Sequence, residues 1–467
     1  MNILYLTSEA YPFASTGGLG DVSGSLPSHL SARGIDVRVM LPLYKAIPQS
    51  FREKMKKECD FTVYLSWRRL YCGVFSYVKE GVTYYFLDNE YYFLRDKLYS
   101  EYDDGERFAF FSMATLEAMK YLGFYPDVLH ANDWQTALSI IYLGRFFKWK
   151  EEYSKIKTVF TIHNIEYQGK FDPFILGDVF GLDEGELPLL RHDGCINLMK
   201  GAIEAADLVT TVSPRYADEI KSEEFSHGLS PILQKNAHKL RGILNGIDYS
   251  VYHPEGYSAE DISGKKLCKV ALQKELGLPE REVPLISVIS RLVTHKGIDL
   301  IVDSAFSLLE ERDVQLVVLG QGDSRFECFF IALQDKFPQK VRSVIAYDRE
   351  LSKRIYSASD IFLMPSKSEP CGLSQMIASR YGAIPVVRET GGLFDSIKPY
   401  FTEGDIIHGN GFTFWDYSGG ALRFQIDSAL ALLQSSNAEK LIKKIMNADF
   451  SWDKSAMEYE KLYKEEK

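Results

Sequence analysis

Short apolar runs recur along the chain and alternate with longer segments whose apolar residues are spaced as in amphipathic helices. This alternation is typical of βα units, in which crossover helices join parallel strands. The runs are almost continuously apolar, as expected for strands that helices cover on both faces. The predicted strands are 3–6, 37–41, 128–130, 158–162 and 208–212 in the first half, and 285–289, 315–319, 361–364 and 384–387 in the second.

The chain has 467 residues, which is too many for one ordinary hydrophobic core, so two domains are predicted. The turn-forming run Asn245-Gly246-Ile247-Asp248 and the polar stretch 253–264 mark the boundary between them. We therefore predict two doubly wound α/β domains, at residues 1–246 and 247–448.

Two segments depart from the βα pattern. Residues 59–108 are rich in Tyr and Phe, and they are predicted to form an antiparallel extension of the first sheet. Residues 449–467 have the spacing of one amphipathic helix, with Ser451 as its N-cap.

Composition narrows the class of protein. Hydrophobic residues make up 46% and charged residues 25%, the profile of a soluble globular protein, and the net charge of -10 argues against nucleic acid or an anionic membrane as a partner. The N-terminus reads as a first strand without a basic leader, and no apolar run approaches the ~20 residues of a membrane span. The six cysteines are scattered, which predicts reduced thiols in the cytoplasm rather than a zinc site or disulfides.

The most informative motif is Glu369-Pro370-Cys371-Gly372-Leu373, between the predicted strand 361–364 and a helix-like segment at 374–381. Open α/β sheets bind ligands outside the carboxyl ends of their strands. Backbone N–H groups at the start of a helix can hold a phosphate, and the Glu369 carboxylate can accept hydrogen bonds from sugar hydroxyls. This segment therefore predicts a site for a nucleotide-sugar.

Two cations follow the predicted strand 285–289 in the same half of the chain. Arg291 and Lys296 have the chemistry to clamp a diphosphate. A solvated loop is equally compatible with these two residues alone. Their position at a strand end near Glu369 favours the binding interpretation.

In the first half, residues 16–21 read Thr-Gly-Gly-Leu-Gly-Asp and follow the first predicted strand. Glycines let the backbone approach a ligand, and the helix start favours an anion; a tight βα turn without ligand is an equal alternative. The spacing is not Gly-x-Gly-x-x-Gly, so the dinucleotide fingerprint is absent.

Other polar residues also follow predicted strands. His163 follows 158–162, where a ligand contact is slightly favoured over a structural hydrogen bond. Asp133 follows 128–130 and has a helix cap as its alternative role. Tyr347 has the chemistry to stack on a purine, and Thr390-Gly391 can form a backbone nest. Phosphate-loop, His-Glu-x-x-His and Gly-x-Ser-x-Gly motifs are absent, so metal, kinase-type and serine-hydrolase chemistry lack support.

Taken in order, these motifs resemble those of the bacterial glycogen synthases, which are retaining glucosyltransferases that use ADP-glucose. The resemblance runs nearly end to end. It implies a GT-B fold, with two Rossmann-like domains facing a deep cleft and a last helix that returns to the first domain. It further implies ADP-glucose and an α-1,4-glucan as partners, with no metal and no cofactor. The motifs that carry it are Ser8-Glu9-Ala10, Thr16-Gly17-Gly18-Leu19-Gly20-Asp21, Asn132-Asp133-Trp134, His163-Asn164, Asn245-Gly246-Ile247-Asp248, Ser290-Arg291, Lys296-Gly297, Glu369-Pro370-Cys371-Gly372-Leu373 and Thr390-Gly391-Gly392-Leu393.

The resemblance also assigns roles to residues. It implies that Arg291 and Lys296 hold the donor diphosphate, that Glu369 binds glucose hydroxyls, and that His163 contacts the 6-hydroxyl. It places Tyr347 on the adenine and Asp133 on the acceptor side. The residues that it implies bind substrate are Ser15, Gly18, Asp21, Asp133, Asn245, Tyr347, Cys371, Gly372, Leu373, Thr390 and Gly391.

Three positions depart from the family's pattern. Ser15 stands where a donor-binding Lys is usual, Ser230 where Glu is usual, and Asp193 where Tyr is common. One lost charged hydrogen bond costs ~1.5–3 kcal/mol, which is damaging but not abolishing. Two alternatives therefore stay open: a glucan- or nucleotide-binding paralogue with weak catalysis, and a related glucosyltransferase that uses UDP-glucose. The sequence does not give the oligomeric state.

Overall fold

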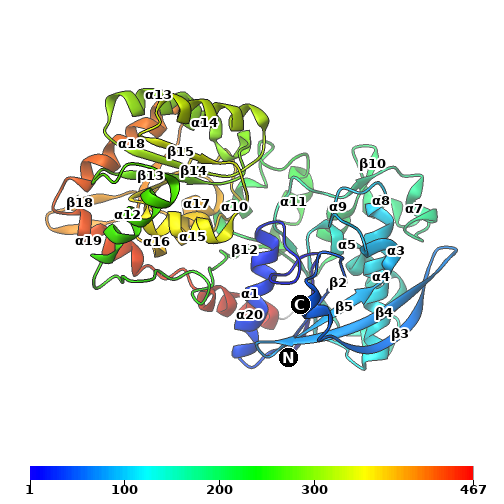
Figure 1. Ribbon diagram of the computed structural model, residues 1–467. Coiled ribbons are helices and arrows are strands. Elements are labelled where there is room, and N and C mark those ends of the chain that lie inside the picture. The colour runs from blue at the N-terminus through cyan, green and yellow to red at the C-terminus, as the bar shows by residue number, and fades with distance from the viewer. Residues whose placement is uncertain (466–467) are drawn as a thin grey trace. The chain divides into compact units, whose positions relative to one another are not determined.

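The structure is a computed structural model that describes residues 1–465, and it comprises two α/β units (Figure 1). The N-terminal unit contains Met1–Asn245 together with the segment that begins at Trp452, and the C-terminal unit contains Gly246–Ser451. Each unit has its own largely or wholly parallel sheet and its own hydrophobic core. That the first half binds the acceptor and the second half the donor stays a prediction.

The N-terminal unit is built on a nine-stranded sheet in the order β12-β11-β7-β6-β1-β2-β5-β4-β3. All five strands predicted in this half are confirmed, and β12 is added at the edge. The first strand has β2 on one side and β6 on the other, so the winding direction reverses there. The parallel strands are β1 (Asn2–Leu6), β2 (Asp36–Pro42), β5 (Val82–Asp88), β6 (Val128–Asn132), β7 (Lys157–Ile162), β11 (Leu208–Thr211) and β12 (Leu240–Gly242).

The predicted antiparallel extension is partly confirmed. Strands β3 (Lys56–Leu65) and β4 (Arg68–Lys79) form a long antiparallel hairpin, and β4 pairs antiparallel with β5. Beyond β5 the prediction is wrong, because α3 (Glu90–Phe93) and α4 (Asp104–Leu122) are helices. The aromatic residues of α4 have strand propensity, but this helix is buried on nearly every side, and tertiary packing overrides that propensity.

The remaining elements of this unit connect and cover the sheet. A small sheet in the order β8-β10-β9 lies outside the main one. Its strands are β8 (Lys170–Phe171), β9 (Arg191–His192) and β10 (Cys195–Asn197). The helices are α1 (Gly18–Ala32), α2 (Gln49–Arg52), α5 (Trp134–Tyr142), η1 (Leu143–Phe147), α6 (Glu151–Ser154), α7 (Ile175–Asp178), α8 (Leu187–Leu190), α9 (Leu198–Ala205), α10 (Pro214–Glu219), α11 (Ser230–Lys235) and η2 (Ala237–Lys239).

The C-terminal helix α20 (Trp452–Lys464) belongs to the N-terminal unit and packs beside α1 (Figure 1). Arg33 and Glu460 form an ion pair at 2.6 Å, and His130 Nδ1 lies 2.7 Å from the Tyr463 hydroxyl. Burial lowers the pKa of His130 to about 3, so this contact uses a neutral imidazole. The predicted tail is thus helical over Trp452–Lys464, whereas 466–467 lie outside the described residues.

The C-terminal unit has a six-stranded parallel sheet in the order β15-β14-β13-β16-β17-β20. The four predicted strands are confirmed; the short outer strands β15 and β20 were not predicted. Strand β13 lies between β14 and β16, so the winding direction reverses a second time. The strands are β13 (Leu285–Ile289), β14 (Gln315–Leu319), β15 (Val341–Val344), β16 (Ile361–Met364), β17 (Ile384–Arg388) and β20 (Phe412–Phe414).

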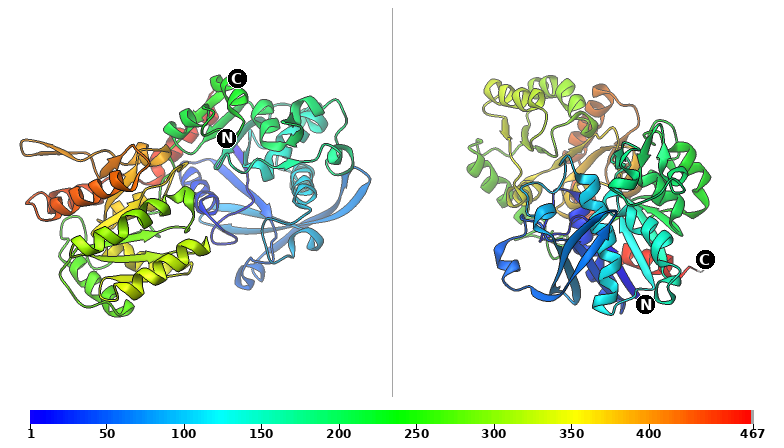
Figure 2. Two further views of the ribbon diagram at one scale, coloured as in Figure 1. Left: turned by 90° about the horizontal axis from the view of Figure 1, so that it is seen from above. Right: turned by 90° about the vertical axis from the view of Figure 1, so that its right-hand side faces the viewer.

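Helices surround this second sheet, and the core forms between its strands and α13, α18 and α19. A separate hairpin of β18 (Phe401–Glu403) and β19 (Ile406–His408) extends away from the rest of the unit (orange in the left view of Figure 2). Among residues 1–465, no helix is long and apolar enough to cross a membrane. The helices are α12 (Gly264–Leu276), η3 (Thr294–Lys296), α13 (Ile298–Glu311), α14 (Ser324–Lys336), α15 (Arg349–Ala358), α16 (Ser374–Arg380), α17 (Gly391–Ser396), α18 (Gly419–Leu433) and α19 (Ala438–Met446).

Candidate active site

Predicted site residues occur in both units, and in each unit they follow the carboxyl ends of adjacent strands. In the C-terminal unit, Arg291 and Lys296 follow β13, Glu369 follows β16 and Thr390 follows β17. In the N-terminal unit, the glycine turn, Asp133 and His163 follow β1, β6 and β7. Both groups include the strands at which the winding direction reverses, where open α/β sheets bind ligands.

Lys296 and Glu369 form the central pair of the C-terminal group. Lys296 Nζ donates to Glu369 Oε2 at 2.6 Å, and Ser366 Oγ donates to the same oxygen at 3.0 Å. The two charged side chains are only 17% and 7% exposed. A half-buried ion pair of this kind holds both groups in one place, because separating them would leave a poorly solvated charge.

Glycines let the backbone pack closely beneath this pair. Gly297 has φ +71°, and a Cβ there would lie 2.0 Å from Pro365 O. Gly391 has φ +43°, and its Cβ would lie 1.9 Å from Glu369 O. The next residue, Gly392, donates its N–H to Glu369 O at 3.1 Å. The loops after β13, β16 and β17 are therefore pressed together, which sets the position of Glu369.

The other predicted residues of this unit differ in exposure. Arg291 is exposed, and its Nη2 lies 3.3 Å from His295 Nε2. Tyr347 is 81% exposed, so its ring is open to a stacking partner. Cys371 and Thr390 are buried within the packed loops.

In the N-terminal group, His163 is a neutral hydrogen-bond acceptor. Burial lowers its pKa to about 3. Asn132 Nδ2 donates to Leu6 O at 2.8 Å, so Asn132 Oδ1 is the acceptor for His163 Nε2, also at 2.8 Å. Because Nε2 then carries the ring proton, Nδ1 keeps its lone pair. His163 can accordingly accept a hydrogen bond from a hydroxyl group.

Asp133 precedes α5, but its side chain does not cap that helix. Its Oδ1 instead accepts the His163 N–H at 2.8 Å, from a backbone with φ +57°. Burial raises the pKa of Asp133 to about 7, although hydrogen bonds from the His163 and Asn164 backbone oppose the rise. Asp133 thus occupies the N-cap position of α5 without capping it through its side chain, which instead links the ends of β6 and β7.

The glycine turn after β1 is held by a buried carboxylate that was not among the predicted site residues. Glu9 accepts the Thr16 N–H at 2.5 Å and the Thr16 hydroxyl at 2.7 Å. The Tyr99 hydroxyl donates to the same carboxylate at 2.8 Å. These three bonds anchor the turn that leads to Gly18, the first residue of α1.

Ser15 lies against this turn. Its hydroxyl is 3.4 Å from Gly17 O, and a Cβ on Gly20 would lie 2.1 Å from it. A Cβ on Gly18, by contrast, would meet nothing within 4 Å. Asp21 lies in the first turn of α1. The backbone at Gly18 is thus open to a ligand, whereas Gly20 is needed for packing on Ser15.

Three further residues lie elsewhere in the N-terminal unit: the predicted site residue Asn245, and Ser230 and Asp193, which depart from the family's pattern. Asn245 follows β12 and is buried, with no partner for its Oδ1 among residues 1–465. Ser230 is buried at the start of α11. Asp193, at φ +48°, lies in the turn between β9 and β10. The structure does not bring these three residues to the Asp133 and His163 cluster by any hydrogen bond that it records.

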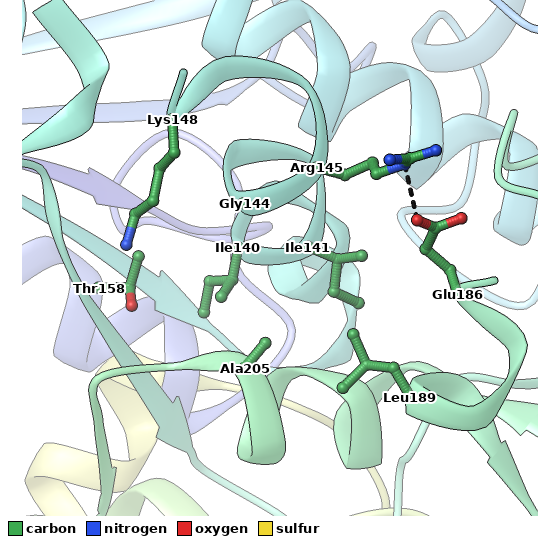
Figure 3. A pocket seen from close by; sticks show the side chains of 9 residues that line it. All are labelled: Ile140, Ile141, Gly144, Arg145, Lys148, Thr158, Glu186, Leu189 and Ala205. Carbon is green, nitrogen blue, oxygen red and sulfur yellow. Dashed lines mark ion pairs between the residues drawn. The ribbon is translucent and has the colours of Figure 1, made fainter. Parts of the chain in front are cut away.

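A pocket of about 230 Å³ lies on another side of the N-terminal unit, between α5, η1, α8 and α9 (Figure 3). Ile140, Ile141 and Leu189 form an apolar floor, and Arg145 pairs with Glu186 at 2.6 Å along its edge. None of its lining residues is a predicted site residue. The candidate active site therefore rests on the strand ends and not on this pocket.

The fold and these strand-end groups define the class: a two-domain glycosyltransferase of the GT-B type. The family described as "Starch synthase catalytic domain" matches residues 2–235, and "Glycosyl transferases group 1" matches residues 271–445. The glycogen synthase of Bacillus subtilis (strain 168) is 45% identical over 476 residues, covering 100% of this chain and 98% of its own. That of Clostridium botulinum (strain Alaska E43 / Type E3) is also 45% identical, covering 100% and 99%.

Solved structures agree with this. The catalytic domain of Starch Synthase IV from Arabidopsis thaliana, bound to ADP and acarbose, has a TM-score of 0.92 and 35% identity, covering 99% of this chain and 98% of its own. Sucrose-phosphate synthase from Thermosynechococcus elongatus, at 18% identity, covers 99% and 98% with a TM-score of 0.64 and shares the fold alone. The chain belongs to the glycogen and starch synthase family of glycosyltransferases.

Proposed function

We propose that this protein transfers glucose from ADP-glucose to the non-reducing end of an α-1,4-glucan, with retention of configuration. The observation that carries the proposal is the half-buried Lys296–Glu369 pair, at 2.6 Å, where the second sheet reverses its winding. Full-length identity of 45% to glycogen synthases supports the reaction. The starch synthase that binds ADP and acarbose supports the nucleotide and the glucan.

The reaction breaks a sugar–phosphate bond, so negative charge grows on the leaving diphosphate. Arg291 and Lys296 would stabilise that charge, and preplaced donors are usually the largest electrostatic contribution of a site. The neutral His163 would accept a hydrogen bond from the glucose 6-hydroxyl through its Nδ1 lone pair. Glu369 would bind the hydroxyls near the reacting carbon.

Retention raises the question of a covalent intermediate, since retaining glycosidases use a carboxylate nucleophile. Glu369 Oε2 already accepts hydrogen bonds from Lys296 and Ser366. Both donors withdraw charge from this oxygen and make it a weak nucleophile. We therefore favour a same-face reaction in which the leaving phosphate accepts the proton of the acceptor hydroxyl.

The finer assignments belong to the same proposal. The N-terminal unit would bind the glucan, with Asp133 on the acceptor side, and the C-terminal unit would bind the donor, with Tyr347 on the adenine. The structure records no disulfide among the six cysteines, all of which lie within residues 1–465, and this fits a reducing cytoplasm. Ser15, in place of the usual lysine, is the observation that favours two alternatives: a glucosyltransferase with another donor such as UDP-glucose, and a glucan- or nucleotide-binding protein with weak catalysis.

The test is incorporation of glucose into glycogen by the purified protein, with ADP-glucose and UDP-glucose in parallel. We expect transfer from ADP-glucose at an ordinary enzymatic rate. Faster transfer from UDP-glucose would overturn the donor assignment. A folded protein that binds glycogen but transfers from neither donor would overturn the enzymatic proposal.

A further inference from the structure

Gln375, in the first turn of α16, touches the loop that carries Glu369. Its side chain is completely buried, and its amide nitrogen lies 3.2 Å from Cys371 O and 2.9 Å from Gly372 O. The same nitrogen lies 3.0 Å from Ser396 Oγ on α17. One amide group therefore draws two consecutive carbonyls of the loop toward the interior.

The orientation of these carbonyls sets the direction of two donors. In a planar trans peptide the C=O and the N–H point in opposite directions. The N–H groups of Gly372 and Leu373 therefore point away from the Gln375 amide. Neither N–H has an acceptor within the described part of the chain. Two adjacent unpaired donors beside Glu369 are suited to oxygen atoms of a phosphate.

The oxygen of the same amide shows that this arrangement has a cost in folding free energy. Gln375 Oε1 is buried without a partner, and it lies 2.6 Å from where a Cβ on Gly372 would be. An unpaired buried acceptor destabilises a fold. Rotating the amide would turn Oε1 onto the carbonyls of Cys371 and Gly372, where oxygen would face oxygen. The amide is therefore held in the orientation in which its N–H groups face these carbonyls.

A second loop joins the arrangement. Ser396 Oγ, which accepts from Gln375, donates to Gly392 O at 2.6 Å, and the Gly392 N–H donates to Glu369 O at 3.1 Å. Gln375 thus connects the loop after β16 with the loop after β17. Both loops contain residues that the proposed function assigns to the donor.

We propose that Gln375 is a positioning residue for the donor phosphate, whose amide holds the two peptides so that the N–H groups of Gly372 and Leu373 face that phosphate. This inference rests on the proposed function and deepens it, because it names what orients the backbone donors. Gln375 itself does not touch the substrate. Its effect is transmitted through two peptide groups.

The test replaces Gln375 by Met, which has a similar length and no donor, and measures ADP binding by calorimetry together with steady-state kinetics. We expect the Kd for ADP and the KM for ADP-glucose to rise about 10- to 100-fold, the loss for one or two hydrogen bonds to a charged group. The KM for glycogen should stay within about twofold. A purely structural role would change both substrates alike.

The matched control is Ser379→Ala in the same helix. The buried Ser379 hydroxyl donates to Gln375 O at 2.8 Å, so its loss removes a buried hydrogen bond without touching the loop. We expect a lower melting temperature and unchanged ADP binding. Should Gln375→Met fail to fold, Ser396→Ala is the second variant, with a rise of a few fold in the KM for ADP-glucose.

The outcomes separate two failures. A folded Gln375→Met protein that binds ADP as wild type does, or unchanged donor kinetics in Ser396→Ala, overturns this inference and leaves the proposed function standing. A wild-type protein that binds neither ADP nor ADP-glucose overturns the proposed function and this inference with it.

Discussion

The two glycine-containing loops of the candidate site occupy similar places, each just past the carboxyl end of a parallel strand (β1 and β17), yet their glycines have opposite uses. An added Cβ on Gly18 would meet nothing within 4 Å, whereas one on Gly391 would lie 1.9 Å from Glu369 O. Gly18 leaves room for something outside the chain, and Gly391 leaves room for the chain itself. Substitution in the two loops should therefore separate binding from folding.

The two groups also differ in charge. In the N-terminal unit burial lowers the pKa of His163 to about 3 and raises that of Asp133 to about 7, so at neutral pH His163 is uncharged and Asp133 is only partly ionised. In the C-terminal unit Lys296 and Glu369 form an ion pair, with Arg291 exposed nearby in sequence. This contrast supports the proposal that the C-terminal unit stabilises the anionic leaving group.

The largest expected effect comes from removing the charged pair of the C-terminal unit. Glu369→Ala and Lys296→Ala should each lower the rate of glucose transfer by about 1,000-fold or more, because they remove groups proposed to act on the developing charge. Circular dichroism should show both proteins folded. The matched control is Lys269→Ala, which breaks another half-buried pair of this unit, Lys269–Asp360 at 2.5 Å. It should cost stability and leave transfer intact; full turnover by either site variant would refute the assignment.

The next effect sharpens the contrast between the glycines. Gly391→Ala should lower the free energy of unfolding by about 1–3 kcal/mol or more, through overpacking against Glu369 O. Gly18→Ala should leave stability unchanged or slightly higher, since Ala favours a helix, while the KM for ADP-glucose rises about tenfold because a methyl group takes the ligand's space. Chemical denaturation and initial rates measure both. Gly144→Ala, at a glycine where an added Cβ would also meet nothing within 4 Å, is the remote control. A KM for ADP-glucose in Gly18→Ala equal to that in Gly144→Ala would contradict a ligand at Gly18.

A pH experiment examines the buried carboxyl group of the N-terminal unit. The Asp133 carboxyl has a pKa of about 7 in the folded protein and 3.8 as its ordinary value. Between these values the folded state keeps a proton that the unfolded chain has lost, so this group's stabilisation is complete below pH ~4 and is lost as the pH rises to ~7. Asp133→Asn removes that dependence. The free energy of unfolding of Asp133→Asn, relative to that of wild type, should rise by roughly 2–4 kcal/mol from pH 4 to pH 8. If the stability of both proteins changes with pH in the same way, the pKa of Asp133 is not shifted.

The smallest expected effect adds charge to the N-terminal unit. Ser15 is exposed and already carries a Cβ against Gly20, so Ser15→Lys requires no new space at the backbone. The new ammonium group should lower the KM for ADP-glucose by about tenfold, within the ~1.5–3 kcal/mol of a charged hydrogen bond. Ser15→Met, of similar length without charge, is the control. The same gain from Met would show that the effect comes from packing and not from charge.

Much of the site was predictable because its residues follow strands that are visible as apolar runs. Arg291, Lys296, Glu369, Asp133 and His163 all lie just past such runs, and parallel strands bring their carboxyl ends to one edge. Residues that act from inside the fold were missed. Glu9 was noticed only as part of a motif, and no local signal distinguishes a buried carboxylate that accepts three hydrogen bonds from a surface one.

The sequence by itself determined the alternation of strands and helices, the division into two α/β halves, and the identity of the groups at the strand ends. These depend on local periodicity and on turn chemistry, which neighbouring residues carry. Only the tertiary structure decided the protonation state of those groups and the direction of their hydrogen bonds. The tautomer of His163 depends on Asn132 and, through it, on Leu6, and the direction of the Gly372 and Leu373 donors depends on one buried amide. Such properties arise from desolvation and from partners distant in the chain, and both exist only once the strands are assembled.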